Sequence, residues 1–148
     1  MVSTTGMDLM VSFELLLWCV LVGAGYLLVV SVLLDWLERK LKLTEGIPRE
    51  MIESEGWIWT FMNFFMESLF YVVIPAIAFS FFYVILPVAG AKGGVGAALF
   101  AFVLGAAPLG MRLSVRVKLP MPYLLYTMLG HLVKLAGTLA IIGYLYSL

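Results

Sequence analysis

Four long apolar runs separated by polar connections make up most of this chain of 148 residues, and they limit what it can fold into. Hydrophobic residues make up 64% of the sequence and charged residues only 12%, whereas soluble domains are nearer to half apolar and a quarter charged. An apolar helix of about 20 residues crosses the ~30 Å hydrocarbon core of a bilayer. We therefore predict an all-α integral membrane protein, a bundle of four transmembrane helices that forms a single domain over residues 1–148, with spans near residues 10–34, 57–86, 93–111 and 121–147.

The Lys and Arg residues predict which way the bundle faces. The polar first connection, residues 35–56, has four of them and the third connection has three, whereas the second has only Lys92. Because basic connections stay in the cytoplasm, we expect the first and third connections on that side of a cell membrane and both termini on the non-cytoplasmic side. The basic residues that set this orientation are Arg39, Lys40, Lys42, Arg49, Arg112, Arg116 and Lys118.

Two ionisable residues, His131 and Lys134, stand in the middle of the last run, and Glu67 stands in the middle of the second. Both runs are expected to lead outward from the cytoplasm, so depth can be counted at ~1.5 Å per residue from Trp57 and Pro122. Glu67 then lies about 15 Å deep, and His131 and Lys134 lie about 13 and 18 Å deep. All three are expected near the middle of the bilayer, where an isolated charge is unfavourable by about 2.5–3.5 kcal/mol on insertion scales.

Opposite charges at one depth predict a pair. A buried carboxylate and a buried ammonium offset most of each other's desolvation when they are paired and hydrogen-bonded. We expect Glu67 to pair with Lys134 or His131, either within one chain or across a subunit interface. Such a pair fits a static contact that fixes helix register, or a relay for protons or ions, and both interpretations stay open. The residues expected to satisfy the remaining donors and acceptors of this mid-membrane polar cluster are Tyr26, Asn63, Tyr71 and Thr127.

Small residues recur every four positions along the third run, and others occur in the fourth. Rows of this kind let two helices approach closely, so we predict helix packing and further assembly of the protein through these two runs. Pro75 lies inside the second run and is expected to kink it near the middle. The predicted packing residues are Gly93, Ala97, Ala101 and Gly105 in the third run and Ala136 and Ala140 in the fourth.

The sequence shows no motif for catalysis, cofactor binding or metal binding. It lacks GxSxG and HExxH patterns, and its single histidine and its single cysteine, Cys19, lie at different depths and cannot build a zinc site. We therefore predict no catalytic residue, no cofactor and no metal. The formal net charge of zero gives no electrostatic argument for nucleic acid as a partner, which leaves membrane lipids, other membrane subunits or further copies of the chain.

Three functions are compatible with these features. The first is a non-enzymatic subunit, scaffold or accessory component of a membrane complex, which fits the missing catalytic motifs and the rows of small residues. The second is an oligomeric transporter or channel, coupled to protons or ions through Glu67, His131 and Lys134. The third is a membrane enzyme, or a protein that binds a quinone or a lipid, in which His131 acts on the ligand.

Overall fold

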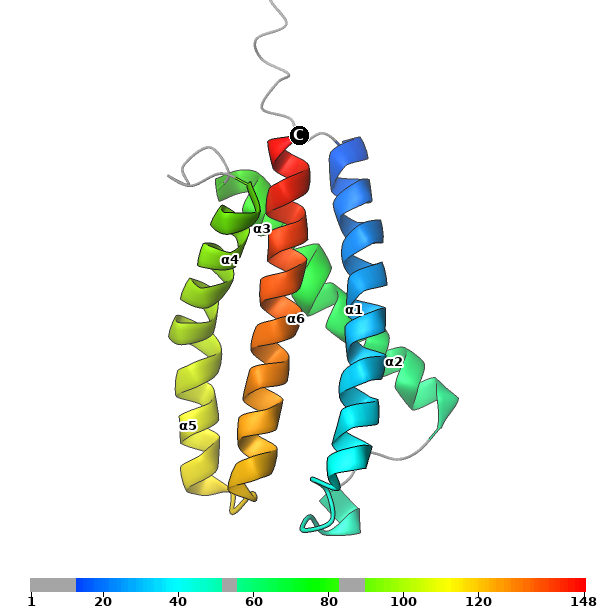
Figure 1. The fold of residues 1–148 in the computed structure, drawn as a ribbon, viewed down its shortest axis with the longest axis vertical. Coiled ribbons are helices and arrows are strands. Elements are labelled where there is room, and N and C mark those ends of the chain that lie inside the picture. Colours follow the sequence, from blue (N-terminus) through cyan, green and yellow to red (C-terminus); the bar gives the residue numbers. More distant parts are fainter. Residues whose placement is uncertain (1–12, 52–55, 83–89) are drawn as a thin grey trace, which may run out of the picture.

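The structure, a computed structural model, describes residues 13–51, 56–82 and 90–148, and the described residues form helices and turns without a strand (Figure 1). The second and third long helices are each continuous but carry several labels, because a π-helical segment interrupts each of them. The elements are α1 (Phe13–Leu41), the 3-10 helix η2 (Arg49–Met51), α2 (Trp57–Ser68), the π-helix η3 (Leu69–Val73), α3 (Ile74–Phe82), α4 (Gly90–Ala101), the π-helix η4 (Phe102–Ala106), α5 (Ala107–Arg116) and α6 (Met121–Ser147).

Four of these helices are long and apolar enough to span a membrane, which confirms the predicted all-helical class and the four apolar runs. The limits of the third helix differ from the predicted ones: it begins at Gly90 rather than at residue 93 and continues to Arg116 rather than ending near residue 111. The first helix runs beyond the membrane span predicted for it, because its last turns belong to the polar connection, and it ends where Lys42 adopts a left-handed backbone with φ of 52°. Residues 10–12 and 83–86, the predicted ends of the first and second runs, lie outside the described residues.

The helix α6 is the centre of the arrangement (Figure 1). It packs against α4 on one side and α1 on the other, and these helices run roughly side by side. The continuous helix α2–η3–α3 crosses behind α1 and α6 on a diagonal. The start of α1 and the end of α6 lie at one end of the bundle, whereas the end of α1, the end of α5 and the start of α6 lie at the other.

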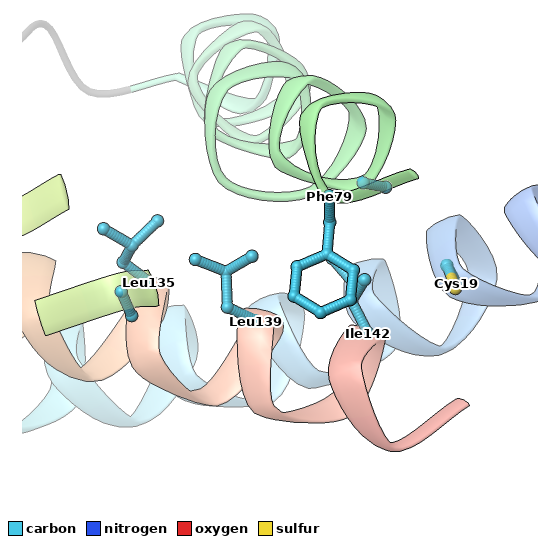
Figure 2. Packing of buried hydrophobic residues seen from close by; sticks show 7 residues of the cluster. Cys19, Phe79, Leu135, Leu139 and Ile142 are labelled. Carbon is cyan, nitrogen blue, oxygen red and sulfur yellow. The ribbon is translucent and has the colours of Figure 1, made fainter. Parts of the chain in front are cut away.

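The apolar core lies between α6 and its neighbours in the half of the bundle where α6 ends (Figure 2). Leu139 and Ile142 of α6 are buried under Phe79 of α3, and Cys19 of α1 lies beside them. Burial of such side chains is worth roughly 1.5–3 kcal/mol each in water, but between membrane helices the gain comes from close packing instead. The remaining members of the buried cluster are Ala76, Ala98 and Leu135.

Each of the two π-helical segments ends two residues before a proline. Ile74 and Ala107, which precede Pro75 and Pro108, donate their N–H groups five residues back, to the carbonyls of Leu69 and Phe102. A proline has no N–H group, and its ring would clash with the carbonyl four residues earlier in a regular α-helix, so a wider turn at that point relieves the clash. The disturbance expected at Pro75 is therefore present as a π-helical turn.

The turn η3 changes which face of its helix meets α6. Glu67 and Tyr71, four residues apart, share one face before and within the turn, and a regular α-helix would continue this row through residues 75 and 78. The buried residues after Tyr71 are instead Val72, Ala76 and Phe79, one position later. The extra residue of the π-helical turn thus allows both the polar row and the apolar row to face the rest of the bundle.

Candidate functional site

Glu67, near the end of α2, joins three helices through its carboxylate. Its Oε1 accepts a hydrogen bond from the Lys134 ammonium of α6 at 2.6 Å, and its Oε2 accepts one from the Ser31 hydroxyl of α1 at 2.9 Å. The Lys134 side chain is 12% exposed and that of Glu67 is 32% exposed. The carboxylate is therefore fully engaged within one chain, although its outer side is open to the surroundings of the bundle.

A second contact lies one helical turn away from this ion pair. Tyr71 follows Glu67 by four residues, and its hydroxyl is hydrogen-bonded to Nδ1 of His131. The two rings meet edge to face with centroids 5.0 Å apart, and the Lys134 ammonium stands 5.8 Å from the Tyr71 ring. His131 and Lys134 are three residues apart on α6 and so share one face of that helix. We call Ser31, Glu67, Tyr71, His131 and Lys134 the polar cluster.

Both π-helical turns place an aromatic ring against His131. Tyr71 belongs to η3, and Phe102, the first residue of η4, has its ring centroid 6.1 Å from that of His131. The imidazole is half-buried between these two rings. His131 therefore lies beside both places where the helical ladder is widened, and such turns are often found at functional sites.

The other residues predicted for the cluster lie around it with different contacts. Tyr26 of α1 donates to the backbone carbonyl of Val133 at 3.1 Å, next to Lys134. Asn63 is half-buried one turn before Glu67 on α2. Thr127 is exposed, and its hydroxyl donates to the carbonyl of Tyr123 in its own helix at 2.9 Å, so it does not contribute to the contacts of Glu67.

Sequence reasoning missed Ser31 and Phe102. Ser31 continues the buried row Cys19–Gly23–Leu27 of α1 at a spacing of four residues, so its position on that row was a usable signal. Phe102 continues the row Gly90–Gly94–Ala98 of α4 at a spacing of four residues, and this row lies on the side of α4 that meets α6. The sequence did not single it out, because it is one of ten phenylalanines and the predicted row of small residues began one position earlier, at Gly93.

The small residues of α4 and α6 pack these two helices against each other within the chain. The closest approach uses Gly94 and Gly143: a side chain at Gly94 would overlap the carbonyl of Leu139, and one at Gly143 would overlap the carbonyl of Gly90. Of the predicted row, Gly93 is buried and Ala97 packs against the core, whereas Ala101 and Gly105 are exposed. In α6, Ala136 packs against the core, and the Cα atom of Ala140 borders the space beside Gly94.

Comparisons with protein-family models, with curated proteins and with solved structures give no match to this chain. The functional argument therefore depends on the geometry of the polar cluster and on the surface around it.

Two further features bear on the chemistry. Among the described residues, no group of three or more His, Cys, Asp or Glu side chains is placed to hold a metal ion. A shallow, open hollow lies on α4 and is lined mainly by apolar atoms, and none of its lining residues belongs to the polar cluster. Those residues are Ala91, Lys92, Val95, Gly96 and Leu99.

Proposed function

We propose that this chain is a small, non-enzymatic integral membrane protein that acts as a subunit of a membrane complex. In this proposal its four apolar helices cross a cell membrane, with the first and third connections in the cytoplasm and both termini on the opposite side. This orientation follows from the seven basic residues of those two connections against the single Lys92 of the second.

The observation that carries the proposal is that Glu67 is hydrogen-bonded to both Lys134 and Ser31. Both carboxylate oxygens accept hydrogen bonds from side chains of α1 and α6, and the Lys134 side chain is nearly buried. An ion pair satisfied in this way neutralises two charges that would each be unfavourable inside a bilayer. It supports a structural role, in which the pair fixes the position of α2 relative to α1 and α6.

The surface of α2 supports assembly with other membrane helices. No residue of α2 is buried, in contrast to α6, which buries six. Trp59 is 50% exposed and Phe65 is 61% exposed, and Figure 1 shows the start of α2 reaching beyond α1, away from the other helices. Aromatic side chains on a helix that packs weakly on its own chain are suited to contact a neighbouring subunit.

A second candidate, a proton- or ion-coupled transporter, is favoured by one specific observation. The Glu67 side chain keeps about a third of its surface exposed although it is paired, and the hydrogen-bonded Tyr71 and His131 lie beside it. Glu, His and Lys side chains at membrane depth serve as proton relays in pumps and transporters. In an oligomer, the exposed side of Glu67 would be the place for a wet path to reach the cluster.

The test is to tag the chain in its own host at its natural level, to extract it with the surrounding lipid, and to measure the mass and composition of the particles. We expect particles with a fixed ratio of this chain to its neighbours. The double variant Trp59→Ala/Phe65→Ala should lose them, whereas the control Val103→Ala/Leu104→Ala, which is also exposed, should keep them. Particles that hold one copy and nothing else would contradict the proposal.

A flux assay separates the two candidates. The purified chain is reconstituted in vesicles containing a pH-sensitive dye, and a pH gradient or a membrane potential is imposed. The subunit proposal expects no flux above that of empty vesicles. Flux that is present with the unmodified chain and abolished by Glu67→Gln would favour the transporter instead.

A further inference from the structure

The charges of this chain are divided unevenly along its sequence. All nine acidic residues lie at or before Glu67, and the remainder of the chain has none. Lys134 in that remainder is paired with Glu67, and Lys92 lies near the start of α4. The other Lys and Arg residues after Glu67 are Arg112, Arg116 and Lys118, which we call the α5–α6 basic patch.

The α5–α6 basic patch is exposed, and none of its residues takes part in an ion pair with a described acidic residue. All three side chains are exposed, and across the part of the chain that the structure describes, the ion pairs are Lys42 with Glu45 and Lys134 with Glu67. Arg112 and Arg116 lie four residues apart on α5 and so share one face of the helix. Nothing within the described part of the chain neutralises these charges.

The patch lies in a tight connection between two helices. Val117 leaves the helix with an extended backbone, its N–H bonds to the carbonyl of Leu113, and α6 begins at Met121. The start of α6 has no side-chain cap, and the dipole of the helix adds positive potential beside Lys118. The whole connection therefore attracts anions.

The surroundings of the patch are apolar rather than polar. Met111 is 72% exposed and Val115 is 87% exposed, and they alternate with the basic residues along α5. An acidic soluble protein would leave these side chains in water, whereas the headgroup region of a bilayer takes basic and apolar side chains together. The combination favours a lipid surface over a soluble partner.

The other basic residues at this end of the bundle lie in a stretch of sequence that also contains six acidic residues. The turn after α1 lies against the start of α6, since a side chain at Gly46 would meet Pro120 at 3.5 Å. In that first connection Arg39, Lys40 and Arg49 stand among acidic residues, so their charges are largely offset. The acidic residues of this connection are Asp35, Glu38, Glu45, Glu50, Glu53 and Glu55.

We propose that the α5–α6 basic patch binds the phosphate groups of anionic phospholipids in the membrane leaflet at this end of the bundle. Arg112 and Arg116 provide planar guanidinium groups that can hold a phosphate by two hydrogen bonds each, and Lys118 adds a point charge beside the start of α6. Met111 and Val115 contact the acyl region. This inference needs the chain to lie in a membrane, but it does not need a protein partner.

The test compares two lipids on the full chain purified in a neutral detergent. Native mass spectrometry measures the affinity of phosphatidylglycerol and of phosphatidylcholine for the unmodified chain and for two triple variants. The first, Arg112→Gln/Arg116→Gln/Lys118→Gln, removes the patch. The second, Arg39→Gln/Lys40→Gln/Arg49→Gln, removes the same number of charges from the first connection and serves as the control.

We expect the unmodified chain to prefer the anionic lipid and the patch variant to lose that preference. The loss should be about fivefold for each basic residue, or on the order of 100-fold for three, and it should shrink with added salt. The control variant should keep most of the preference. The variant Arg112→Lys/Arg116→Lys keeps the charges but loses the two-point hydrogen bonding, so it should keep only part of the preference, and circular dichroism checks that every variant folds.

Three outcomes would overturn the proposal. The first is an equal affinity of the unmodified chain for the two lipids, which would show that the patch does not select anionic lipid. The second is an equal loss in both triple variants, which would assign the preference to overall charge. The third is displacement of the anionic lipid by an equal concentration of inorganic phosphate, which would assign the patch to a free anion.

Discussion

The hydroxyl of Tyr26 lies over the backbone of Gly137, in the space that a side chain at that position would occupy. From there it donates to the carbonyl of Val133, so α1 is held against α6. About two turns before Val133 on α6, Tyr126 reaches in the other direction and donates to the carbonyl of Leu34 in α1. Each helix thus contributes one tyrosine that bonds to the backbone of the other, on either side of the polar cluster.

Gly137→Ala should separate α1 from α6. The added methyl group overlaps the Tyr26 ring, and overpacking of this kind is unfavourable by about 1–3 kcal/mol. We expect a lower midpoint when the protein is unfolded in detergent. Gly105→Ala is the matched control, because open space surrounds that position, and it should be neutral or slightly stabilising. Equal midpoints for the two variants would show that the helices are not this close.

Lys134→Met should destabilise the bundle more than the double variant Glu67→Gln/Lys134→Met. The single change leaves the Glu67 carboxylate without its cation, which is unfavourable by about 3–5 kcal/mol for a fully buried pair and by less here, since Glu67 is a third exposed. The double change removes both charges. A double-mutant cycle on the unfolding midpoints measures the coupling, and additive effects would contradict a direct pair.

Tyr71→Phe should change the state of the His131 ring with little loss of stability. We expect the Tyr71 hydroxyl to donate to Nδ1, which holds the neutral ring with its proton on Nε2. Without the hydroxyl, both tautomers become populated, and about 0.5–1.5 kcal/mol of stability is lost. The chain has a single histidine, so ¹⁵N-histidine labelling reads this site directly. An unchanged ¹⁵N spectrum would rule out the contact.

Pro75→Ala should remove the reason for the π-helical turn before it. With an N–H at position 75, the helix can return to regular hydrogen bonding, which rotates the row of Glu67 and Tyr71 relative to the row of Val72. We expect a lower unfolding midpoint and a shifted ¹⁵N signal from His131. Pro122→Ala, a change in the first turn of α6, is the control and should alter neither. If Pro75→Ala changes neither the unfolding midpoint nor the ¹⁵N signal of His131, tertiary contacts and not the proline hold the π-helical turn.

The sequence was informative where a rule depends on length or depth alone. The apolar runs predicted four helices because length and composition decide whether a helix can cross a bilayer. The depth count brought Glu67 and Lys134 to one level because their two helices were expected to run in the same direction. The structure places these two side chains 2.6 Å apart.

The sequence was less informative where two helices meet. The predicted row of small residues on the third run includes Ala101 and Gly105, which are exposed, because a spacing of four does not say which face of a helix meets its neighbour. The residues closest to α6 are Gly90 and Gly94. Phe102 lies on the same row as Gly90 and Gly94, one position away from the predicted row, so it was missed for the same reason.

The ion pair between Glu67 and Lys134 joins residues that are 67 positions apart in the chain. At a synthesis rate of about 5–20 residues per second, the carboxylate of α2 is made several seconds before its cation exists. In the proposed membrane setting, an insertion intermediate must hold that acid in protonated form, in water or against the insertion machinery until α6 arrives. During this interval the carboxylate of Glu67 has no cation to pair with. Chains truncated before α6 keep that unpaired acid, so we expect cellular quality control to degrade them.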